Sequence, residues 1–433
     1  MKLCALLTAG LFASGFCTLH AQTLEITPST ALSDQTVAIR ATGLQPNQRI
    51  SLQASLVDGA GRHWSSRSEF LADPQGTVDV AHQAPVKGSY NEVSPMGPIW
   101  SMKPDERNVA RYISPLDFAP QMIEFRLLAD GKEVSKGQLE QRTIAEGVRQ
   151  IDVGGKLHGV LFIPGVAGRH PGVLVVGGSE GGLPKQKAAW LASHGFVAFA
   201  LAYFRYEDLP PDLSGIPLEY FGQALGWMKQ RPEVLADHIA VVGTSRGGEL
   251  ALQLASMYPQ IGAVVAYVPA NVRYGGCCGN PRFPYAWTWQ GQPLAYYQPR
   301  GRGTQNPTLA LEAAIAVEHI HGPVLLISGE EDDVWPSSLM TNAIEGRLKS
   351  AHFGYPAQHL NYSHAGHMAG RPEIVPAWHG SLRQPISGRE MNLGGTPKGD
   401  AESTLDAIPK VLEFLRASLE SSSASEPAAS PQN

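Results

Sequence analysis

The stretch HIAVVGTSRGGELALQLASMY, residues 238–258, has the pattern of a buried strand, a tight turn and a helix. A short apolar run at 239–242 leads into the sequence G-x-S-x-G, and apolar residues then recur at helical spacing from 249 to 257. Ser245 stands at the apex, and Gly243 and Gly247 leave room for the strand and the helix to approach each other. The pattern predicts a nucleophile elbow that holds the Ser245 hydroxyl above the carboxyl edge of a sheet. A plain glycine-rich turn is the alternative interpretation.

The length and composition of the chain indicate a folded protein of two domains. It has 433 residues, of which 43 % are hydrophobic, and this is ample for packed cores. The net charge of −5 and the lack of a long basic run argue against a general nucleic-acid binder, because neutralising phosphates requires a basic surface. We expect a small-molecule substrate instead.

The first 21 residues have the composition of a signal peptide. Lys2 is followed by an apolar core from 3 to 16, which is too short for a stable membrane anchor. Phe16 before Cys17 does not suit a lipoprotein signal, and a buried N-terminal helix is disfavoured because a polar, proline-containing segment follows. We therefore expect an exported protein, periplasmic or secreted. Its mature chain would keep the adjacent Cys277 and Cys278, as a vicinal disulfide, an interchain pair or two ordinary thiols.

Residues 22–142 alternate like strands separated by turns. Asp58-Gly59 and Asp130-Gly131 are typical hairpin dipeptides, and the proline-broken segment 90–102 is expected to be a long loop. This half predicts an immunoglobulin-like antiparallel β-sandwich, with candidate strands at 36–44, 49–58, 63–72, 77–80 and 122–128.

Residues 143–419 alternate between strands and helices, which predicts a mainly parallel sheet covered on both faces, the α/β hydrolase fold class. Residues 269–316 interrupt the alternation with glycine, proline and aromatic residues, and we expect a lid there or a solvated insertion. Residues 420–433 are rich in Ser, Ala and Pro and are expected to be disordered. The expected strands are 150–153, 157–163, 172–176, 196–203, 239–242, 261–268, 323–328 and 358–362, and the expected helices are 185–194, 219–229, 249–257, 337–350 and 404–419.

A serine nucleophile needs a base that accepts its proton and a carboxylate that orients the base. The sequence GEEDDVW follows the apolar strand 323–328 and places Asp332 in the loop at the carboxyl end of that strand. Asp332 is the expected acid, and Asp333 is the near alternative. Glu330 and Glu331 lie closer to the strand and fit less well, and a solvated acidic loop is the alternative interpretation of the cluster.

The expected base is His367, in the sequence AGHM between the strand-like segment 358–362 and the last helix. It is preferred over His352, His359 and His364, which lie within, before or just after that strand. A zinc site made of His359, His364 and His367 matches no familiar ligand spacing, so we expect neither a metal nor a cofactor.

The oxyanion of a tetrahedral intermediate needs two amide donors. We expect the amide of Arg246 together with one from the loop around Gly178, Ser179 and Glu180. The loop sequence GGSEGG lacks the Gly-Lys-Ser/Thr ending of a phosphate-binding loop and matches that motif only weakly.

With these residues laid out, the chain resembles the family of type I acyl-CoA thioesterases and bile acid-CoA:amino acid N-acyltransferases. The resemblance covers nearly all of the chain after residue 21. It implies that the family's nucleophile, acid and base fall on Ser245, Asp332 and His367, and that an acyl group passes from a thioester to the serine and then to water. The similar segments are ITPSTALSDQTVAIRATGLQPNQRISLQASLVDGAG, SPMGPIWSMKP, GFVAFALAYFRYEDLP, EYFGQALGWMKQRPEV, VVGTSRGGELAL, GEEDDVW and the GH of AGHM.

Three other functions stay open beside thioester hydrolysis. An exported carboxylesterase would use the same scaffold, and a binding module would use the sandwich without catalysis. Family members that conjugate acyl groups to amino acids are expected to carry cysteine as the nucleophile, so Ser245 favours hydrolysis. In the expected lid, Arg273, Trp287 and Trp289 are weak candidates for substrate contact; Arg273, Arg282, Arg300 and Arg302 form either a phosphate clamp or a set of solvated arginines.

Overall fold

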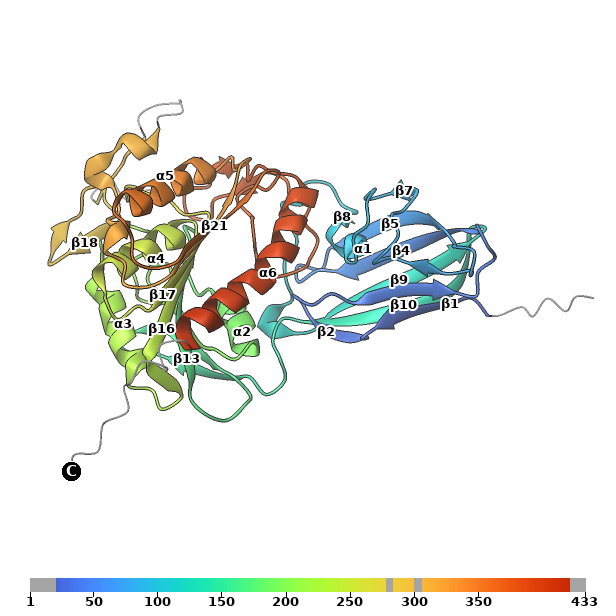
Figure 1. Ribbon diagram of the computed structural model, residues 1–433, viewed down its shortest axis with the longest axis horizontal. Helices are drawn as coiled ribbons and strands as arrows, with labels where there is room; N and C mark the ends of the chain where they lie inside the picture. Colours follow the sequence, from blue (N-terminus) through green and yellow to red (C-terminus); the bar gives the residue numbers. More distant parts are fainter. Residues whose placement is uncertain (1–20, 278–282, 300–305, 421–433) are drawn as a thin grey trace, which may run out of the picture.

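The computed structural model describes residues 21–277, 283–299 and 306–420, and these form two lobes (Figure 1). Strands between residues 23 and 142 build one lobe, and the described residues from 143 onward build the other. Except for Ala21, the expected signal peptide lies outside the described residues. The expected tail does too, except for Glu420, which ends the last helix.

The N-terminal lobe is a sandwich of two sheets, as the alternating sequence predicts. Apolar side chains from both sheets, such as Ile39 and Phe125, meet in one core, and the pairings are antiparallel except that β2 runs parallel to β10. The smaller sheet has the order β1 (Thr23–Thr27), β3 (Ala38–Thr42), β6 (Val78–Asp79). The larger has the order β2 (Thr30–Leu32), β10 (Lys132–Arg142), β9 (Gln121–Ala129), β4 (Arg49–Val57), β5 (His63–Leu71), β7 (Lys87–Gly88), with β8 (Lys103–Pro104) also paired to β5.

The expected loop 90–102 contains one helical turn, α1 (Gly97–Trp100). Proline at its first turn is compatible with a helix start, because the missing N–H would have no helical partner there. Met96, Ile99 and Met102 are buried, so this segment packs into the sandwich core and is not a solvated loop.

The C-terminal lobe is built on an eight-stranded sheet, which confirms the expected α/β hydrolase class. Six strands from β14 to β21 are parallel, while β11 and β12 add an antiparallel edge. Every residue of β12, β14, β17 and β20 is buried, which explains why their sequences are almost entirely apolar. The order is β11 (Arg149–Val153), β12 (His158–Ile163), β14 (Val197–Ala202), β13 (His170–Val176), β16 (Val234–Thr244), β17 (Ala263–Tyr267), β20 (Val324–Gly329), β21 (Ala357–Tyr362).

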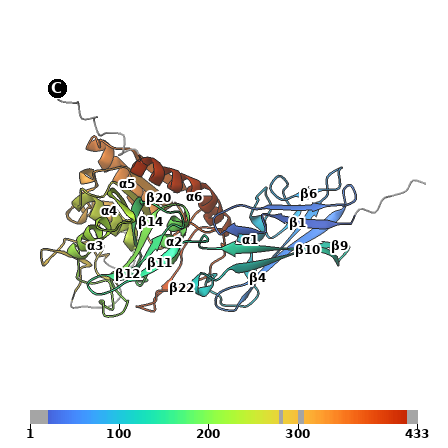
Figure 2. The same ribbon diagram turned by 90° about the horizontal axis from the view of Figure 1, so that it is seen from below.

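Helices cover both faces of this sheet (Figures 1 and 2). The face that α2 (Lys185–Ser193) and α6 (Pro397–Glu420) cover shares a continuous core with the sandwich. The opposite face packs on α3 (Glu219–Lys229), α4 (Arg246–Met257) and α5 (Ser337–Ser350). Helix α6 begins seven residues before the expected start at 404. The expected start is too late because Asp400 and Ser403 are buried in the structure but make the first turns of the helix look polar in the sequence.

Residues 269–316 carry only short elements in their described part. Strand β18 (Trp287–Trp289) pairs with β15 (Ile216–Pro217) and with β19 (Gln292–Pro293). The 3₁₀ turns η2 (Pro307–Leu309) and η3 (Leu311–Ala313) follow, and η4 (Val317–His319) lies just beyond. Two strands between the last parallel strand and α6, β22 (Leu382–Arg383) and β23 (Glu390–Met391), pair with each other.

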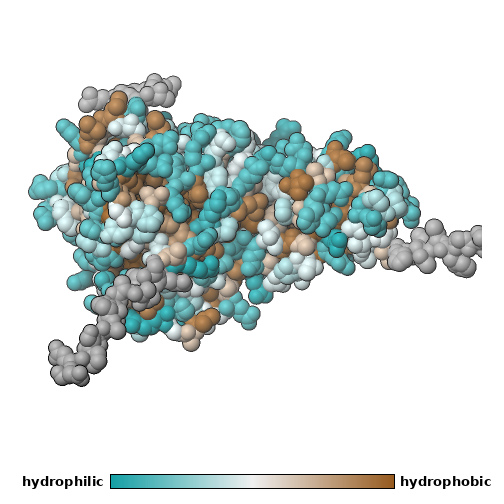
Figure 3. All heavy atoms as spheres, viewed as in Figure 1, coloured by the Kyte–Doolittle hydropathy of each residue, from teal (hydrophilic) through white to brown (hydrophobic). Residues whose placement is uncertain are grey.

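The surface seen in Figure 3 is largely hydrophilic over both lobes, with hydrophobic residues in separate patches. No helix in the described part of the chain combines the length and the apolar content that crossing a membrane requires.

Candidate active site

Ser245 lies in the turn between β16 and α4 with a strained backbone. Its φ of 58° and ψ of −121° are unusual for a residue with a side chain. The Ser245 amide donates to the Tyr267 carbonyl at 2.9 Å, and its own carbonyl accepts from the Glu249 amide at 3.0 Å. A Cβ on Gly247 would collide with the carbonyls of Val176 and Gly177, so only glycine lets the helix approach β13 here.

His367 lies between Ser245 and Asp332. Its Nε2 is 2.9 Å from Ser245 Oγ, and its Nδ1 is 2.8 Å from Asp332 Oδ2. The Asp332 side chain is fully buried, and its Oδ1 accepts the amides of Val334 and Trp335 at 3.0 and 3.3 Å. The carboxylate can only accept, so Nδ1 donates to it and Nε2 is left to accept the serine proton. This geometry suits transfer of a proton from the hydroxyl to the imidazole.

The other acidic and histidine candidates make no hydrogen bond to the serine in the described part of the chain. Asp333 is exposed and accepts from the amide nitrogen of Asn392 at 2.6 Å. His364 contacts Glu331 at 3.0 Å, and His359 bonds both Ser328 and Glu345 at 2.7 Å. Glu330 accepts from Asn361, and His352 is exposed. The three histidines weighed as zinc ligands thus have separate partners.

Of the backbone amides expected to bind the oxyanion, one already donates to a side chain and the others remain candidates. Arg246 is the first residue of α4, where backbone amides point out of the helix end. In the other loop, the Gly178 amide donates to Glu180 Oε1 at 3.2 Å, and Glu180 itself is exposed. Ser179 lines the same cavity as Ser245, so the amide of Ser179 is the better second candidate.

A cavity of about 470 Å³ opens beside Ser245. Tyr274 and Trp335 form an aromatic wall, with ring centres 5.1 Å apart, and Trp335 meets the His367 ring edge-on at 5.8 Å. The lining residues are Ser179, Ser245, Arg246, Tyr274, Gly275, Gly276, Cys277, Gln298, Pro299, Asp333, Val334, Trp335, Gln384, Ser387, Arg389, Glu390, Met391 and Asn392. Cys277 takes part in a disulfide, and its neighbour Cys278 lies outside the described residues.

The loop of His367 is held by residues that the sequence did not single out. The His367 amide donates to the Leu393 carbonyl at 2.8 Å, and Gly394 forms a β-bridge with Asp332. A Cβ on Gly366 or on Gly394 would collide with the facing backbone. The segment 392–395, NLGG, therefore lies between the loops of Asp332 and His367. Its paired glycines before the last helix are the one sequence signal that could have indicated it.

A buried ion pair on the first turn of α4 fastens the wall of the cavity. Arg246 donates to the carbonyls of Tyr274 and Gly275 at 3.0 and 2.8 Å. Glu249, with no exposed surface, pairs with Arg246 at 3.0 Å and accepts from the Tyr274 amide at 3.3 Å and the Trp287 indole at 2.7 Å. Burial raises the pKa of Glu249, against the pull of Arg246. The role of Glu249 was missed because two of its partners, Tyr274 and Trp287, are distant in sequence.

The three expected substrate contacts in the lid lie away from the cavity. Arg273 donates to the carbonyls of Ala295, Glu312 and Ala314, so it braces the loop. Trp287 is buried against Glu249, and Trp289 packs on Tyr258. None of the three lines the cavity beside Ser245, and we correct that expectation. Of the other clamp candidates, Arg282, Arg300 and Arg302 lie outside the described residues.

Replacing Glu249 by alanine is expected to lower the free energy of unfolding by about 3–5 kcal/mol, because Arg246 would stay buried without its counter-charge. Glu312→Ala, which removes an exposed carboxylate from the insertion 269–316, is the control and should change stability little. Urea unfolding of both variants measures the difference. Equal midpoints for the two would contradict the role of the buried pair.

Lys187 lies behind the elbow. Its Nζ donates to Thr244 Oγ1 at 2.6 Å and lies 3.6 Å from the centre of the Tyr267 ring. Burial lowers the pKa of Lys187 to about 7. Thr244 precedes Ser245 in the chain, and the carbonyl of Tyr267 accepts the Ser245 amide. The Lys187 amine therefore contacts both residues that fix the backbone of the serine.

One group among the described residues has the spacing to hold a metal ion, namely His158, Glu207 and Asp208. Each ring nitrogen of His158 is already paired with a carboxylate, at 2.6 and 3.1 Å. The group therefore fits a structural ion-pair cluster better than a metal centre.

Comparison with known proteins connects both lobes to one family. Residues 34–154 match the acyl-CoA thioester hydrolase/BAAT N-terminal region, and residues 216–277 and 298–421 match the BAAT/acyl-CoA thioester hydrolase C-terminal region. Acyl-coenzyme A thioesterase 1 of Rattus norvegicus is 31 % identical, with 89 % of this chain and 94 % of that protein covered. The peroxisomal succinyl-coenzyme A thioesterase of Mus musculus is 30 % identical over 91 % and 96 %, and the mitochondrial acyl-coenzyme A thioesterase 2 of Rattus norvegicus is 30 % identical over 92 % and 89 %.

These relatives overturn the expectation of export. One is named for the peroxisome and for succinyl-coenzyme A, and another for the mitochondrion and for acyl-coenzyme A. The expectation rested only on the composition of residues 1–21, where a lysine precedes an apolar run. Such a run is defined by hydrophobicity alone, so it is a weaker indication than similarity across the whole chain.

Proposed function

Because the chain belongs to the acyl-CoA thioester hydrolase/BAAT family, we propose that it hydrolyses acyl-coenzyme A thioesters through an acyl-enzyme formed on Ser245. The observation that carries the mechanism is the position of His367, within hydrogen-bond distance of both Asp332 Oδ2 and the Oγ of Ser245, a residue that lines a cavity. His367 is the proposed general base and Asp332 the residue that orients it.

In the first half of the reaction, Ser245 Oγ attacks the thioester carbonyl while its proton moves to His367 Nε2. The carbonyl oxygen becomes an oxyanion, for which the amides of Arg246 and Ser179 are the proposed donors. Collapse of this intermediate breaks the carbon–sulfur bond. The imidazolium returns its proton to the leaving sulfur, so coenzyme A departs as a thiol and the acyl group remains as a serine ester.

In the second half, His367 removes a proton from water, and the hydroxide attacks the serine ester. Collapse of the second intermediate breaks the bond to Ser245 Oγ, which takes back the proton, and the carboxylic acid is released. Asp332 stabilises the charged imidazole in both halves, and its burial keeps water from competing for the Nδ1 proton.

Hydrolysis is favoured over transfer to an amino acid because the nucleophile is a serine. An oxygen ester reacts less readily with an amine than a thioester would, so a serine-bound acyl group is better suited to release by water. The aromatic wall of Tyr274 and Trp335 supports an acyl group as the occupant of the cavity, since it offers apolar surface next to the hydroxyl.

The test compares purified protein on acyl-coenzyme A esters of several chain lengths, on aryl esters of the same acids, and on acyl-coenzyme A with added glycine or taurine. We expect kcat/KM to be at least about tenfold higher for the thioesters, because binding energy from the coenzyme A portion adds to that of the acyl group. Release of free thiol and mass spectrometry of the products measure the outcome. Faster aryl ester cleavage would make the protein a carboxylesterase, and acyl-glycine or acyl-taurine as the main product would make it a transferase.

A further inference from the structure

We propose that Asp400 and His379 are positioning residues, through which the N-terminal sandwich holds the loop of the proposed base in place. The inference rests on the proposed role of His367 and adds a role for the lobe that contributes no residue to the triad. Its observations form a continuous series of contacts from the sandwich to His367.

The first contact fixes the backbone next to the base. The amide of Gly366 donates to Asp400 Oδ1 at 2.9 Å, and the Asp400 side chain is 1 % exposed. The Gly370 amide donates at 3.0 Å to the Oγ of Ser403, which lies one turn after Asp400 on α6. Both ends of the loop 366–370 are therefore bonded to the first turns of α6, and a buried carboxylate is the stronger acceptor of the two. Loss of Asp400 would leave the Gly366 amide buried without its acceptor.

The second contact connects Asp400 to a segment that the sandwich holds. His379 Nε2 lies 3.2 Å from Asp400 Oδ2, and the His379 side chain is 10 % exposed. Since the carboxylate only accepts, Nε2 is the donor. His379 forms a β-bridge with Arg111, and the Gly380 amide donates to the Ala110 carbonyl at 2.8 Å. The imidazole that holds Asp400 is thus placed by the N-terminal lobe.

Further hydrogen bonds fasten the same segment to the sandwich. The Ile374 amide donates to the Ser33 carbonyl at 2.7 Å, and Gln141 donates to the Ile374 carbonyl at 3.0 Å. The Ala377 amide donates to the Trp100 carbonyl at 2.9 Å. With bonds at 374, 377 and 380, residues 374–380 are fastened along the surface of the sandwich.

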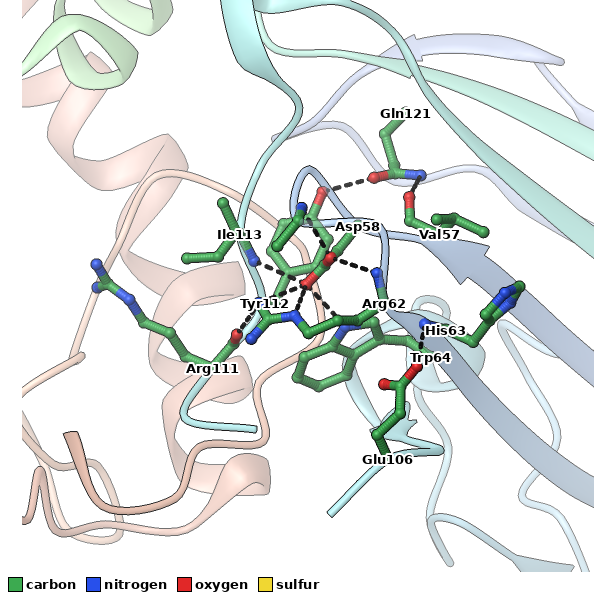
Figure 4. A network of polar contacts seen from close by, with 11 residues as sticks. Val57, Asp58, Arg62, His63, Trp64, Glu106, Arg111, Tyr112, Ile113 and Gln121 are labelled. Carbon is green, nitrogen blue, oxygen red and sulfur yellow. Dashed lines mark hydrogen bonds and ion pairs between the residues drawn. The ribbon is translucent and has the colours of Figure 1, made fainter. Parts of the chain in front are cut away.

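The third contact fixes the part of the sandwich that pairs with His379, through a polar network around Asp58. Figure 4 shows Asp58 at the centre of a polar network that includes Arg62, Trp64 and Ile113. Burial opposes ionisation of Asp58, but hydrogen bonds from Arg62 and Trp64 outweigh it and lower the pKa of Asp58. Arg62 also donates to the Arg111 carbonyl at 2.8 Å. The segment 110–111, which pairs with His379 and Gly380, is therefore bonded to a buried, charged network.

The test separates positioning from general stability with a matched pair on α6. Asp400→Ala removes the acceptor of the Gly366 amide. Asp406→Ala removes a carboxylate two turns along the same helix that contacts Tyr362 and Lys410 and does not touch the loop. We expect Asp400→Ala to lower kcat about 10- to 100-fold with little change in KM, because a displaced base slows the chemistry without weakening substrate binding. Asp406→Ala should keep kcat near that of the wild type.

Two further variants test the series of contacts. Asp400→Asn keeps an oxygen acceptor for Gly366 and should restore most of the activity, which a purely structural role of the charge would not predict. His379→Ala should lower kcat as well, and the double variant with Asp400→Ala should be no slower than Asp400→Ala alone, because both act through one connection. If Asp400→Ala does not fold, His379→Ala and Asp400→Asn decide the question.

The readouts are kcat and KM for thioester hydrolysis, the rate of covalent labelling of Ser245 by a fluorophosphonate, and the melting temperature. Unchanged kcat and labelling rate in folded His379→Ala and Asp400→Ala, or equal losses in Asp406→Ala, would overturn the inference. Wild-type protein that neither labels at Ser245 nor cleaves thioesters would overturn the proposed function, so the two failures can be told apart.

Discussion

Replacing Ser245 by alanine is expected to lower kcat for thioester hydrolysis by about 10⁴-fold or more, because no other hydroxyl takes the place of the one that His367 contacts. Folding should be unaffected. Alanine keeps the Cβ that the strained turn already accommodates, and the backbone bonds to Tyr267 and Glu249 do not involve the hydroxyl. Steady-state kinetics and a thermal melt of the same preparation measure both expectations.

The control for this variant is Ser256→Ala on the same helix. Ser256 Oγ donates to the Gln253 carbonyl and lies at the other end of α4, so its loss should leave kcat close to that of the wild type. A fluorophosphonate should label the wild type and Ser256→Ala but not Ser245→Ala. Hydrolysis at the wild-type rate by Ser245→Ala would refute the acyl-enzyme mechanism.

Much of the fold could be predicted from the sequence because its strands are buried on both faces. Helices α3 and α5 have the expected bounds, 219–229 and 337–350, and each parallel strand falls within a few residues of its apolar run. The α/β rhythm then places the ends of neighbouring strands at one edge of the sheet, so Asp332 was expected near Ser245 without any contact being known.

The segment 371–396 could not be predicted in the same way. It has no long period of either kind, and its conformation depends on partners far along the chain, such as Ser33, Ala110 and Asp332. The early start of α6 was missed for a related reason, since Asp400 is polar by type and buried by context. A sequence pattern indicates which residues are buried within their own helix or strand. Asp400 and the buried residues of this segment instead owe their burial to the packing of one lobe on the other.

The residues of the candidate site also fall into a group that the sequence predicted and a group that it did not. Ser245, Asp332 and His367 each follow a strand and have a chemical reason to be there, and the structure brings all three together. Arg273, Trp287 and Trp289 were chosen only because aromatic and basic residues in a long insertion often bind ligands. Their partners are the backbone of the insertion, Glu249 and Tyr258, and no feature of the sequence pointed to those contacts.

Replacing Asp332 by asparagine is expected to lower kcat about 10³- to 10⁴-fold, because the amide group changes which nitrogen of His367 carries the proton. The backbone amides of Val334 and Trp335 donate to Oδ1 and need an oxygen there, so the new NH₂ group would face His367 Nδ1. Nδ1 must then accept, Nε2 must carry the hydrogen, and it can no longer take the proton of Ser245. The change leaves the shape of the site intact.

Asp333→Asn is the matched control, because it makes the same chemical change one residue away. Asp333 is exposed and bonds only Asn392 among the contacts seen in the described residues, so its neutralisation should change kcat by no more than about threefold. The difference between the two variants should appear in kcat and in the fluorophosphonate labelling rate, with KM and the melting temperature similar in both. If Asp333→Asn lost more activity than Asp332→Asn, the carboxylate that orients His367 in the working enzyme would have to be Asp333, and the loop 330–335 would have to rearrange during the reaction.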